Sequence, residues 1–402
     1  MEVRPGYEQA EVGVIPQEWA VASLSLFADV KTGPFGTAPH ESDYVNDGTP
    51  IITVEHLGER GVVHENLPYV SDADWNRLRA YLLQPGDIVF SRVGSVDRNA
   101  LIRDVEGGWL FSGRLLRVRT RKGNVYPPYL SFYFHSEPFK HRVRAVAVGQ
   151  TMASLNTQIL KGLLVVLPPF PEQRAIAMAL SDVDALLGGL DQVIAKKRDL
   201  KQAAMQQLLT GKGRLPGFHR EWELRKFSDL LTFERPDRYL IKSTDYEGGG
   251  DTPVLTANKS FILGHTNEKF GICESLPVII FDDFTTDSKY VDFPFKVKSS
   301  AIKILRSRRP EVNLRFVAER MRLVSFPGGE HKRYYISEYQ HIELPTPSPE
   351  EQCAIAAVLS DMDAELNVLD ARRDKVRDLK QAMMQDLLTG KTRLIPARGA
   401  NA

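Results

Sequence analysis

The stretch PEQRAIAMALSDVDALLGGLDQVIAKKRDLKQAAMQQLLTGKGRL, which runs from Pro171 to Leu215, recurs later in this chain. When Glu172–Leu215 is shifted by 179 residues it aligns with Glu351–Leu394, and 29 of the 44 aligned pairs are identical. Prolines precede both copies, and near the end of each copy stands Thr-Gly-Lys, so start and stop signals of a helix enclose the same segment twice. The sequence therefore predicts one long helix in two copies, and roughly 38 residues at about 1.5 Å each would span about 57 Å.

Each predicted helix carries one narrow apolar stripe, whose residues alternate steps of four and three as in a coiled-coil seam. The seam residues are Ile176, Leu180, Val183, Leu187, Leu190 and Ile194 in the first copy, and Ile355, Leu359, Met362, Leu366 and Leu369 in the second. After a polar interruption we expect the stripe to resume at Leu200, Ala204 and Leu208, and at Val376, Leu379, Met383 and Leu387. So long a helix with so narrow a seam needs a partner, and we expect the two helices to pair antiparallel. The alternative is that each helix packs only on its own globular domain.

The composition is that of an ordinary globular protein. The 402 residues are 43% hydrophobic and 26% charged, which is enough for two or more cores. Lys plus Arg, 52, nearly balances Asp plus Glu, 51, so any DNA-binding charge must be local. Two cysteines, Cys273 and Cys353, are typical of a reducing compartment. The chain starts without an apolar signal region and has no run of 18 apolar residues, so we expect a soluble, cytoplasmic protein.

Short β-rich runs alternate with turn clusters before each helix. We therefore predict a sheet-based domain at 1–168, a helix at 169–213, a second sheet-based domain at 214–346 and a second helix at 347–396. The predicted fold class is α+β, with two mixed α/β domains separated by two long helices that form an antiparallel coiled coil in a pseudo-two-fold tandem repeat.

The two predicted domains also correspond weakly to each other. The matching pieces are Ile15-Pro16 before Trp19 with Leu215-Pro216 before Trp222, GDIVFSR with PVIIFDD, and SGRLLRV with SSAIKIL. The chain is therefore predicted to be a tandem duplication in which the helices kept their sequence while the domains diverged. Such a protein is suited to two separated sites on one extended partner, and duplex DNA, whose grooves repeat about every 34–36 Å, is the obvious candidate.

No catalytic or metal-binding motif is complete. Gly390–Thr392 resembles the end of a phosphate loop but lacks the required glycine, because Gln385 stands in its place. The sequence YPPY at Tyr126–Tyr129 has a tyrosine where amino-methyltransferases have an acidic or amide residue. The Glu/Asp-x-Lys pairs at Glu330–Lys332 and Asp287–Lys289 resemble part of a nuclease site, which also needs an upstream carboxylate on an adjacent strand, and Asp282 or Asp283 could serve in principle. We therefore predict no catalytic residue and no metal site.

Polar loops with small residues are the best candidates for DNA contacts, because they let backbone amides and long polar side chains approach a ligand. In the first domain these are Lys31, Thr32, Gly33, His40, Arg92, Arg98, Gln150 and Thr151. In the second they are Arg235, Arg238, Asn258, Lys259, Thr285, Thr286, Lys289, Lys332 and Arg333. Arg117, Arg119 and Arg121 share one strand face, which either binds phosphate or is merely solvated. Ordinary turn chemistry is the alternative for the loops.

The doubled unit of prolines, Glu-Gln, heptads and LLTGK, with the TGPFGT loop, GDIVFSR and GQTMASLN, resembles the specificity subunit of type I restriction-modification enzymes. The resemblance implies two target-recognition domains, each reading one half of a split site in duplex DNA, and a coiled coil that docks two methyltransferase subunits. It also implies that this chain binds no cofactor and is not an enzyme. S-adenosylmethionine, ATP and Mg²⁺ would be used by the methyltransferase and the restriction/translocase subunits.

Two other interpretations stay open at this point. The chain could be the recognition subunit of a combined methyltransferase-nuclease system, or a coiled-coil scaffold that presents two protein-binding domains.

One departure within the repeat is Gly188-Gly189, where the second copy has Asn367-Val368. Each glycine costs a helix about 1 kcal/mol relative to alanine, and the pair could mark a bend or a close helix approach.

Overall fold

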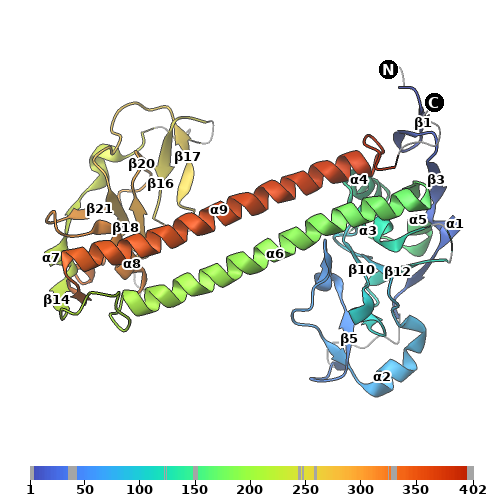
Figure 1. Ribbon diagram of the computed structural model, residues 1–402, viewed down its shortest axis with the longest axis horizontal. Helices are drawn as coiled ribbons and strands as arrows, with labels where there is room; N and C mark the ends of the chain where they lie inside the picture. The colour runs from blue at the N-terminus through green and yellow to red at the C-terminus, as the bar shows by residue number, and fades with distance from the viewer. Residues whose placement is uncertain are drawn as a thin grey trace. The chain divides into compact units, whose positions relative to one another are not determined.

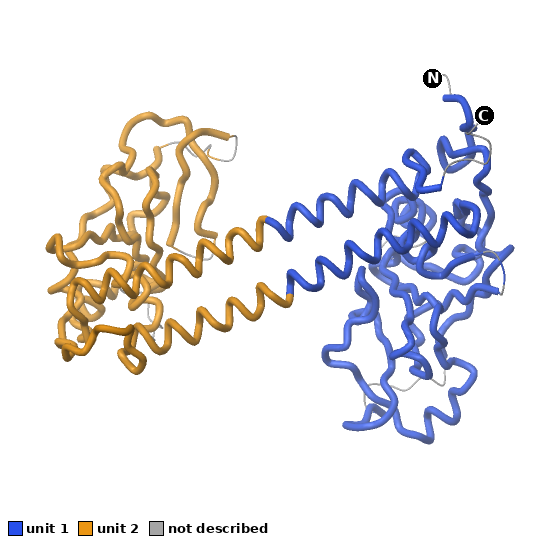
Figure 2. Tube along the Cα trace, viewed as in Figure 1, with its two compact units in different colours: residues 1–191, 372–402 blue, residues 192–371 orange. Residues whose placement is uncertain are grey.

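The computed structural model describes residues 4–34, 43–121, 123, 125–147, 153–242, 246, 249–257, 260–324, 326 and 333–395. Contacts group the chain into two compact units, unit 1 with residues 1–191 and 372–402, and unit 2 with residues 192–371 (Figure 2). Both long helices begin in one unit and end in the other, so this division differs from the four segments expected from the sequence, which remain a prediction.

Unit 1 is built on two small sheets (Figure 1). The antiparallel four-stranded sheet has the order β10-β9-β12-β4, with β4 (Ala28–Thr32), β9 (Ile88–Ser91), β10 (Asn99–Leu101) and β12 (Leu115–Thr120). The three-stranded sheet has the order β11-β5-β8, with β5 (Thr49–Ile52), β8 (Tyr69–Val70) and β11 (Leu110–Phe111), and β11 is parallel to β5. Two hairpins complete the unit: β1 (Tyr7–Ala10) with β2 (Gly13–Pro16), and β6 (Leu57–Gly58) with β7 (Gly61–Val62).

Unit 2 repeats the two main sheets in the same strand order. Its four-stranded sheet is β19-β18-β21-β15, with β15 (Leu231–Glu234), β18 (Val278–Asp282), β19 (Ser288–Val291) and β21 (Ile302–Ser307). Its three-stranded sheet is β17-β16-β20, with β16 (Thr252–Leu255), β17 (Ile262–Thr266) and β20 (Lys296–Val297), and β20 is parallel to β16. The tandem repeat predicted from the sequence is therefore present in the topology.

Helices and a strand pair complete each unit. The helices of unit 1 are α1 (Leu24–Phe27), α2 (Asp72–Arg77), α3 (Pro127–His135), α4 (Glu137–Val146) and α5 (Thr157–Gly162), and those of unit 2 are α7 (Phe227–Leu230) and α8 (Leu314–Arg322). The pairs are β3 (Ala20–Ser23) with β13 (Leu164–Leu167), and β14 (Glu223–Lys226) with β22 (Glu343–Thr346). α3 packs on β10 and α8 on β19, so each four-stranded sheet has a helix against the corresponding strand.

Large aromatic side chains fill both cores. Unit 1 buries Tyr129, Phe134 and Phe139 around Phe90, and unit 2 buries Phe227, Phe281, Phe316, Tyr335 and Tyr339. Each such ring removes about 150–250 Å² from water, so these clusters dominate the hydrophobic stabilisation of the two sheets.

The two long helices are α6 (Phe170–Leu208) and α9 (Pro349–Leu387), each of 39 residues. Within unit 1, Lys380 pairs with Asp184 at 2.7 Å, and within unit 2, Lys197 pairs with Glu365 at 2.7 Å. Rising numbers on one helix meet falling numbers on the other, so the helices pair antiparallel, as predicted. In the first third of each helix the seam residues Ile176, Leu180, Ile355 and Leu359 also belong to the domain cores, so each helix packs on its own domain as well.

The expected continuation of the seam is wrong at Leu200 and Leu379, which are 47% and 54% exposed. The neighbouring lysines face inward instead: Lys201 is 8% exposed and pairs with Asp363, and Lys380 pairs with Asp184. The reason is the heptad itself, because steps of three and four from Ile194 lead to 197 and 201. The polar interruption is therefore part of the seam, and the leucines lie beside it.

Candidate nucleic-acid interface

In unit 1 the predicted DNA-contact loops meet at one end of the four-stranded sheet. The amide of Arg92, just after β9, donates to the carbonyl of Arg114, just before β12, at 2.8 Å. The amide of Leu155 donates to the carbonyl of Arg92 at 2.8 Å, and the amide of Gly33 donates to the carbonyl of Leu115 at 2.9 Å. We call this set, residues 33, 92–94, 112–115 and 153–155, the loop end of unit 1.

Gly33 has an internal reason to be glycine. A Cβ atom at this position would lie 2.0 Å from the carbonyl oxygen of Ser112, so no other residue fits without moving the backbone. The residue is buried. Its small size therefore serves the packing of two loops, and direct contact with DNA stays a prediction for Gly33 and for the partly buried Thr32.

Two predicted DNA contacts of unit 1 are engaged within the protein. The Lys31 ammonium donates to the carbonyl of Ala80 at 2.7 Å and lies 4.3 Å from the centre of the Tyr81 ring. Burial, and then the charges of nearby arginines, lower the pKa of Lys31. The exposed Arg98 donates from Nη2 to the carbonyl of Leu57 at 2.6 Å. Both side chains would have to keep or exchange these partners when DNA binds.

The arginine face of β12 is mostly occupied inside the unit. Arg117 is only 7% exposed, and Arg119 makes two hydrogen bonds of 2.6 Å to the buried carboxylate of Asp87. Arg121 pairs with Asp29 at 3.2 Å. Arg119 and Arg121 are therefore neutralised within the unit, by Asp87 just before β9 and by Asp29 on β4.

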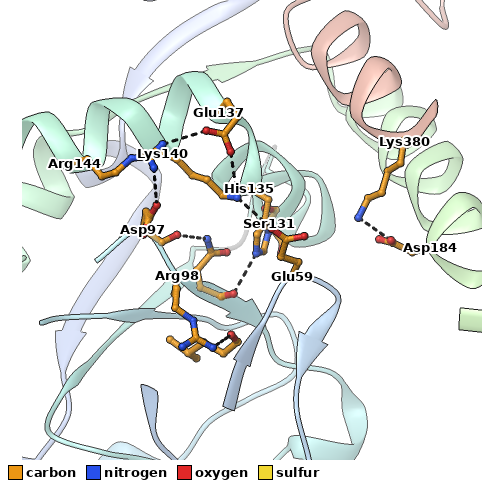
Figure 3. Close-up of polar contacts among 12 residues, drawn as sticks. Glu59, Asp97, Arg98, Ser131, His135, Glu137, Lys140, Arg144, Asp184 and Lys380 are labelled. Atoms are coloured by element: carbon orange, nitrogen blue, oxygen red, sulfur yellow. Dashed lines mark hydrogen bonds and ion pairs between the residues drawn. The ribbon is translucent and has the colours of Figure 1, made fainter. Parts of the chain in front are cut away.

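A polar cluster joins α3 and α4 to β10 and the β6–β7 hairpin (Figure 3). Lys140 pairs with Glu59 at 3.4 Å and with Glu137 at 3.5 Å. Both ring nitrogens of His135 face carbonyl oxygens, Nδ1 that of Ser131 at 2.9 Å and Nε2 that of Asn99 at 3.2 Å. A neutral imidazole can donate to only one of them. Burial is the largest cause that lowers the pKa of His135, so the ring is held neutral.

Unit 2 has the same backbone frame with different side chains. The amide of Asp283 donates to the carbonyl of Ala301 at 3.1 Å, and the amide of Tyr334 donates to the carbonyl of Asp283 at 3.0 Å. The Asp283 carboxylate accepts from the Tyr335 amide at 2.9 Å and pairs with the buried Lys303 at 3.1 Å. Residues 283–287, 299–302 and 333–335 are the loop end of unit 2.

Several predicted contacts of unit 2 lie at or near this loop end. Thr285 and Thr286 occupy the turn between β18 and β19, and Thr286 has a φ of 60°, which is unusual for a β-branched residue. Arg333 is exposed beside Tyr334, and Lys289 is exposed on β19. Arg235 and Arg238, which follow β15, are also exposed.

A hollow of about 580 Å³ opens beside Thr285, lined by Thr256, Ser260, Leu263, Thr285, Asp287, Lys298 and Ser299. Its hydroxyl, carboxylate and ammonium groups can both donate and accept hydrogen bonds, which is what base edges require. His40, Gln150, Thr151, Asn258, Lys259 and Lys332 lie outside the described residues.

Sequence reasoning also missed a clamp that occurs in both units. In unit 1 Glu172, at the start of α6, accepts from the indole of Trp19 at 3.0 Å and from Arg393, after α9, at 2.6 and 2.8 Å. In unit 2 Glu351, at the start of α9, accepts from Trp222 at 3.1 Å and from Arg214, after α6, at 2.6 and 2.7 Å. The signal was visible, because all three residue types recur in the repeat.

The glutamine that follows each clamp glutamate is used in the same way in both units. Gln173 accepts from the amide of Tyr126 at 2.8 Å and donates to the carbonyl of Pro168 at 2.8 Å. Gln352 accepts from the amide of Asn313 and donates to the carbonyl of Pro347, both at 3.0 Å. The Glu-Gln pair thus ties the start of each long helix to its domain.

Within the described part of the chain, no group of three or more His, Cys, Asp or Glu side chains could hold a metal ion. Among the same residues, no helix has the length and apolar character that crossing a lipid bilayer requires.

The family model of the type I restriction modification DNA specificity domain matches residues 16–196 and again residues 219–376. The chain belongs to this family. Its two matches coincide with the two copies of the sheet and helix described above, and recognition of DNA by its sequence is the role of the family. The function expected from the sequence is therefore confirmed at this level, whereas the individual contact residues remain predictions.

Relatives of this specificity family are similar over different lengths. The specificity subunit of the type I restriction enzyme EcoR124I/EcoR124II of Escherichia coli is 39% identical over 183 residues, which cover 41% of this chain and 45% of that protein. The putative type I restriction enzyme MjaX specificity subunit of Methanocaldococcus jannaschii is 26% identical over 416 residues, 96% of this chain and 97% of that protein.

Solved structures of type I specificity subunits share the fold. The S subunit of a type I restriction-modification system from M. genitalium superimposes with a TM-score of 0.63 at 14% identity, over 96% of this chain and 98% of that one. A second chain, from a study of complex assembly and conformational transition of the type I R-M system, gives a TM-score of 0.52 at 13% identity, over 94% and 99%. The predicted α+β architecture with a repeated domain and long helices is confirmed.

Proposed function

We propose that this chain recognises a split target in duplex DNA, with the loop end of unit 1 on one half-site and that of unit 2 on the other. The observation that carries the proposal is the repeated frame. The backbone bonds Arg92–Arg114 and Asp283–Ala301 are equivalent, yet the first joins two arginines and the second an aspartate and an alanine. Two domains that recognise different half-sites require such an arrangement, in which the backbone is shared and the side chains differ.

The two long helices are proposed to set the unspecified spacer between the half-sites and to dock methyltransferase subunits. Leu186, Val193 and Leu200 recur every seven residues along α6 and are 45%, 45% and 47% exposed, beside the seam. Exposed apolar side chains on a paired helix are suited to a further helical partner. The assembly named for the second solved structure is a property of that system and supports this part of the proposal by analogy only.

The proposed chain is not itself an enzyme and binds no cofactor. Methylation with S-adenosylmethionine, and translocation and cleavage with ATP and Mg²⁺, would belong to methyltransferase and restriction/translocase subunits. The support is chemical: the buried carboxylates Glu172 and Asp283 are engaged in ion pairs, with Arg393 and with Lys303.

Methylation mapping of DNA from cells that carry this chain with its partner subunits tests the proposal. The expected motif has two defined segments separated by a spacer of unspecified sequence, with a methylated adenine. A short, undivided motif, or no motif, would contradict it. Purifying the complex and identifying the partner proteins distinguishes separate methyltransferase and restriction subunits from a combined methyltransferase-nuclease.

A further inference from the structure

Arg114 stands in the tight connection between β11 and β12, at the centre of the loop end of unit 1. The Ser112 amide donates to the carbonyl of Ile52 at 2.9 Å, and the Leu115 amide donates to the carbonyl of Ser112 at 3.0 Å. The Arg114 carbonyl itself accepts from Arg92 at 2.8 Å. Bonds on both sides of the residue hold its backbone in place, although its side chain is exposed.

Among the arginines of this sheet, Arg114 differs from Arg119 and Arg121 in lacking an ion pair with any described residue, and from Arg117, which is only 7% exposed, in being exposed. Arg119 is paired with Asp87 and Arg121 with Asp29. Among the residues that the structure describes, no hydrogen bond or ion pair engages the Arg114 side chain. An exposed arginine on a rigid backbone therefore presents five N–H donors in a planar fork to solvent.

The duplication supplies an internal comparison. Arg114 corresponds to Ala301 of unit 2, whose carbonyl accepts the equivalent backbone bond from Asp283 at 3.1 Å. Ala301 is 7% exposed, so the equivalent position of unit 2 presents no long side chain. The frame alone does not need an arginine, which leaves the guanidinium of Arg114 without a structural reason in this turn.

We infer that Arg114 is a specificity-determining residue of unit 1 and recognises a guanine in its half-site. The inference rests on the proposed function. An arginine fork matches the O6 and N7 acceptors of guanine in the major groove, which is the commonest base-specific contact. A fixed backbone favours such a two-bond contact over a loose contact with phosphate, because the fork reaches the base edge already oriented. Unit 2, with Ala301, reads the corresponding position of its half-site without an arginine.

The test selects bound duplexes from a random library with the full chain assembled with its methyltransferase subunits. The wild-type complex is compared with Arg114→Lys and Arg114→Ala. Both variants should lose the preference for guanine at one position of one half-site, by a factor of roughly 5 to 150, and keep the other half-site and the spacer. Lysine keeps the charge but not the fork, so it separates base recognition from charge attraction.

Arg121→Ala is the matched control, because Arg121 is an exposed arginine at the other end of β12. It should leave the motif unchanged, and thermal unfolding of each complex shows that every variant folds. The inference is overturned if the Arg114 variants bind as wild type does, if binding weakens equally for all sequences as expected for a phosphate contact, or if the affected base is not guanine. A wild-type motif that is not split would instead overturn the proposed function, and the inference with it.

Discussion

At the residue scale, the clamp glutamates explain why the repeat keeps Glu, Trp and Arg at matching places. The Glu172 side chain is 1% exposed and receives two bonds from the guanidinium of Arg393. A buried carboxylate with a planar two-bond partner is stable only while both members remain, because either charge alone would be buried without compensation.

We therefore expect Glu172→Gln to lower the free energy of unfolding by about 3 kcal/mol, the usual cost of breaking a buried ion pair. Urea unfolding measures the effect. The control is Glu223→Gln, which removes an exposed carboxylate paired with Arg225 and should leave the unfolding midpoint nearly unchanged. Equal effects of the two substitutions would show that the clamp contributes no more than a surface pair.

The glycines of the first repeat make a second test at this scale. A Cβ atom on Gly188 would lie 3.8 Å from Nη1 of Arg60, and a Cβ atom on Gly189 would have no atom of the described residues within 4 Å, so no close helix approach among those residues requires either glycine. Gly188→Ala and Gly189→Ala should each raise the free energy of unfolding by about 1 kcal/mol, through helix propensity. Gly33→Ala should instead be destabilising, since its Cβ would collide with the carbonyl of Ser112. Thermal unfolding of the three variants compares them, and a loss of stability at Gly188 would contradict the open geometry.

The buried His135 predicts a pH dependence. Burial lowers the pKa of His135 in the folded state. The charges of Lys140 and Lys380 also lower it, whereas the charge of Glu59 raises it. In the unfolded state this histidine has a pKa of about 6.5, so as the pH falls the unfolded state binds the proton before the folded state does. The neutral His135 ring therefore contributes its full stability above about pH 6.5, and that contribution is lost as the pH drops below this value. When the pH is lowered from about 7 to about 5, the unfolding midpoint of the wild-type chain should decrease, and that of the His135→Gln variant should decrease less. Parallel pH curves for the two proteins would refute the role of this ring.

At the scale of elements, the helix pair separates residues that stabilise from residues that are free to bind a partner. Leu187 is 6% exposed in the seam, whereas Leu200 is 47% exposed beside it. The lysines at 201 and 380 take inward positions because the heptad continues through the polar interruption.

Leu187→Ala should cost about 2–5 kcal/mol of unfolding free energy, as large-to-small changes at buried sites do. Leu200→Glu should change it by no more than about 0.5 kcal/mol, as exposed substitutions do. If α6 docks a methyltransferase subunit, Leu200→Glu should also weaken assembly measured by analytical ultracentrifugation. If the Leu200→Glu variant were as unstable as the Leu187→Ala variant, Leu200 would have to be a buried seam residue.

At the scale of the whole molecule, the two long helices belong to both units, so their length is expected to set the spacer of the target. Adding seven residues to each helix, after Asp191 and after Ala371, keeps the heptad and adds about 10 Å of helix, or about three base pairs. Methylation mapping should return unchanged half-sites with a longer spacer. An unchanged spacer in an assembled, active complex would contradict this role of the helices.

The sequence by itself determined the helices, their antiparallel pairing and the tandem repeat. These follow from local periodicity and from self-similarity, both of which can be counted along the chain. The DNA-binding family followed from the repeated motifs. The inward position of Lys201 could also have been predicted from the sequence, because the strict heptad places Lys201 and not Leu200 in the seam.

Only the tertiary structure decided which polar residues remain available for a ligand. Arg119 and Arg121 differ little from Arg114 in sequence, yet they find Asp87 and Asp29, each more than 30 residues away along the chain. Likewise, the clamp joins Glu172 to Arg393 across 221 residues. Such pairings depend on which strands and loops become neighbours after folding, and the free energy of a charged side chain depends on those neighbours rather than on its place in the sequence.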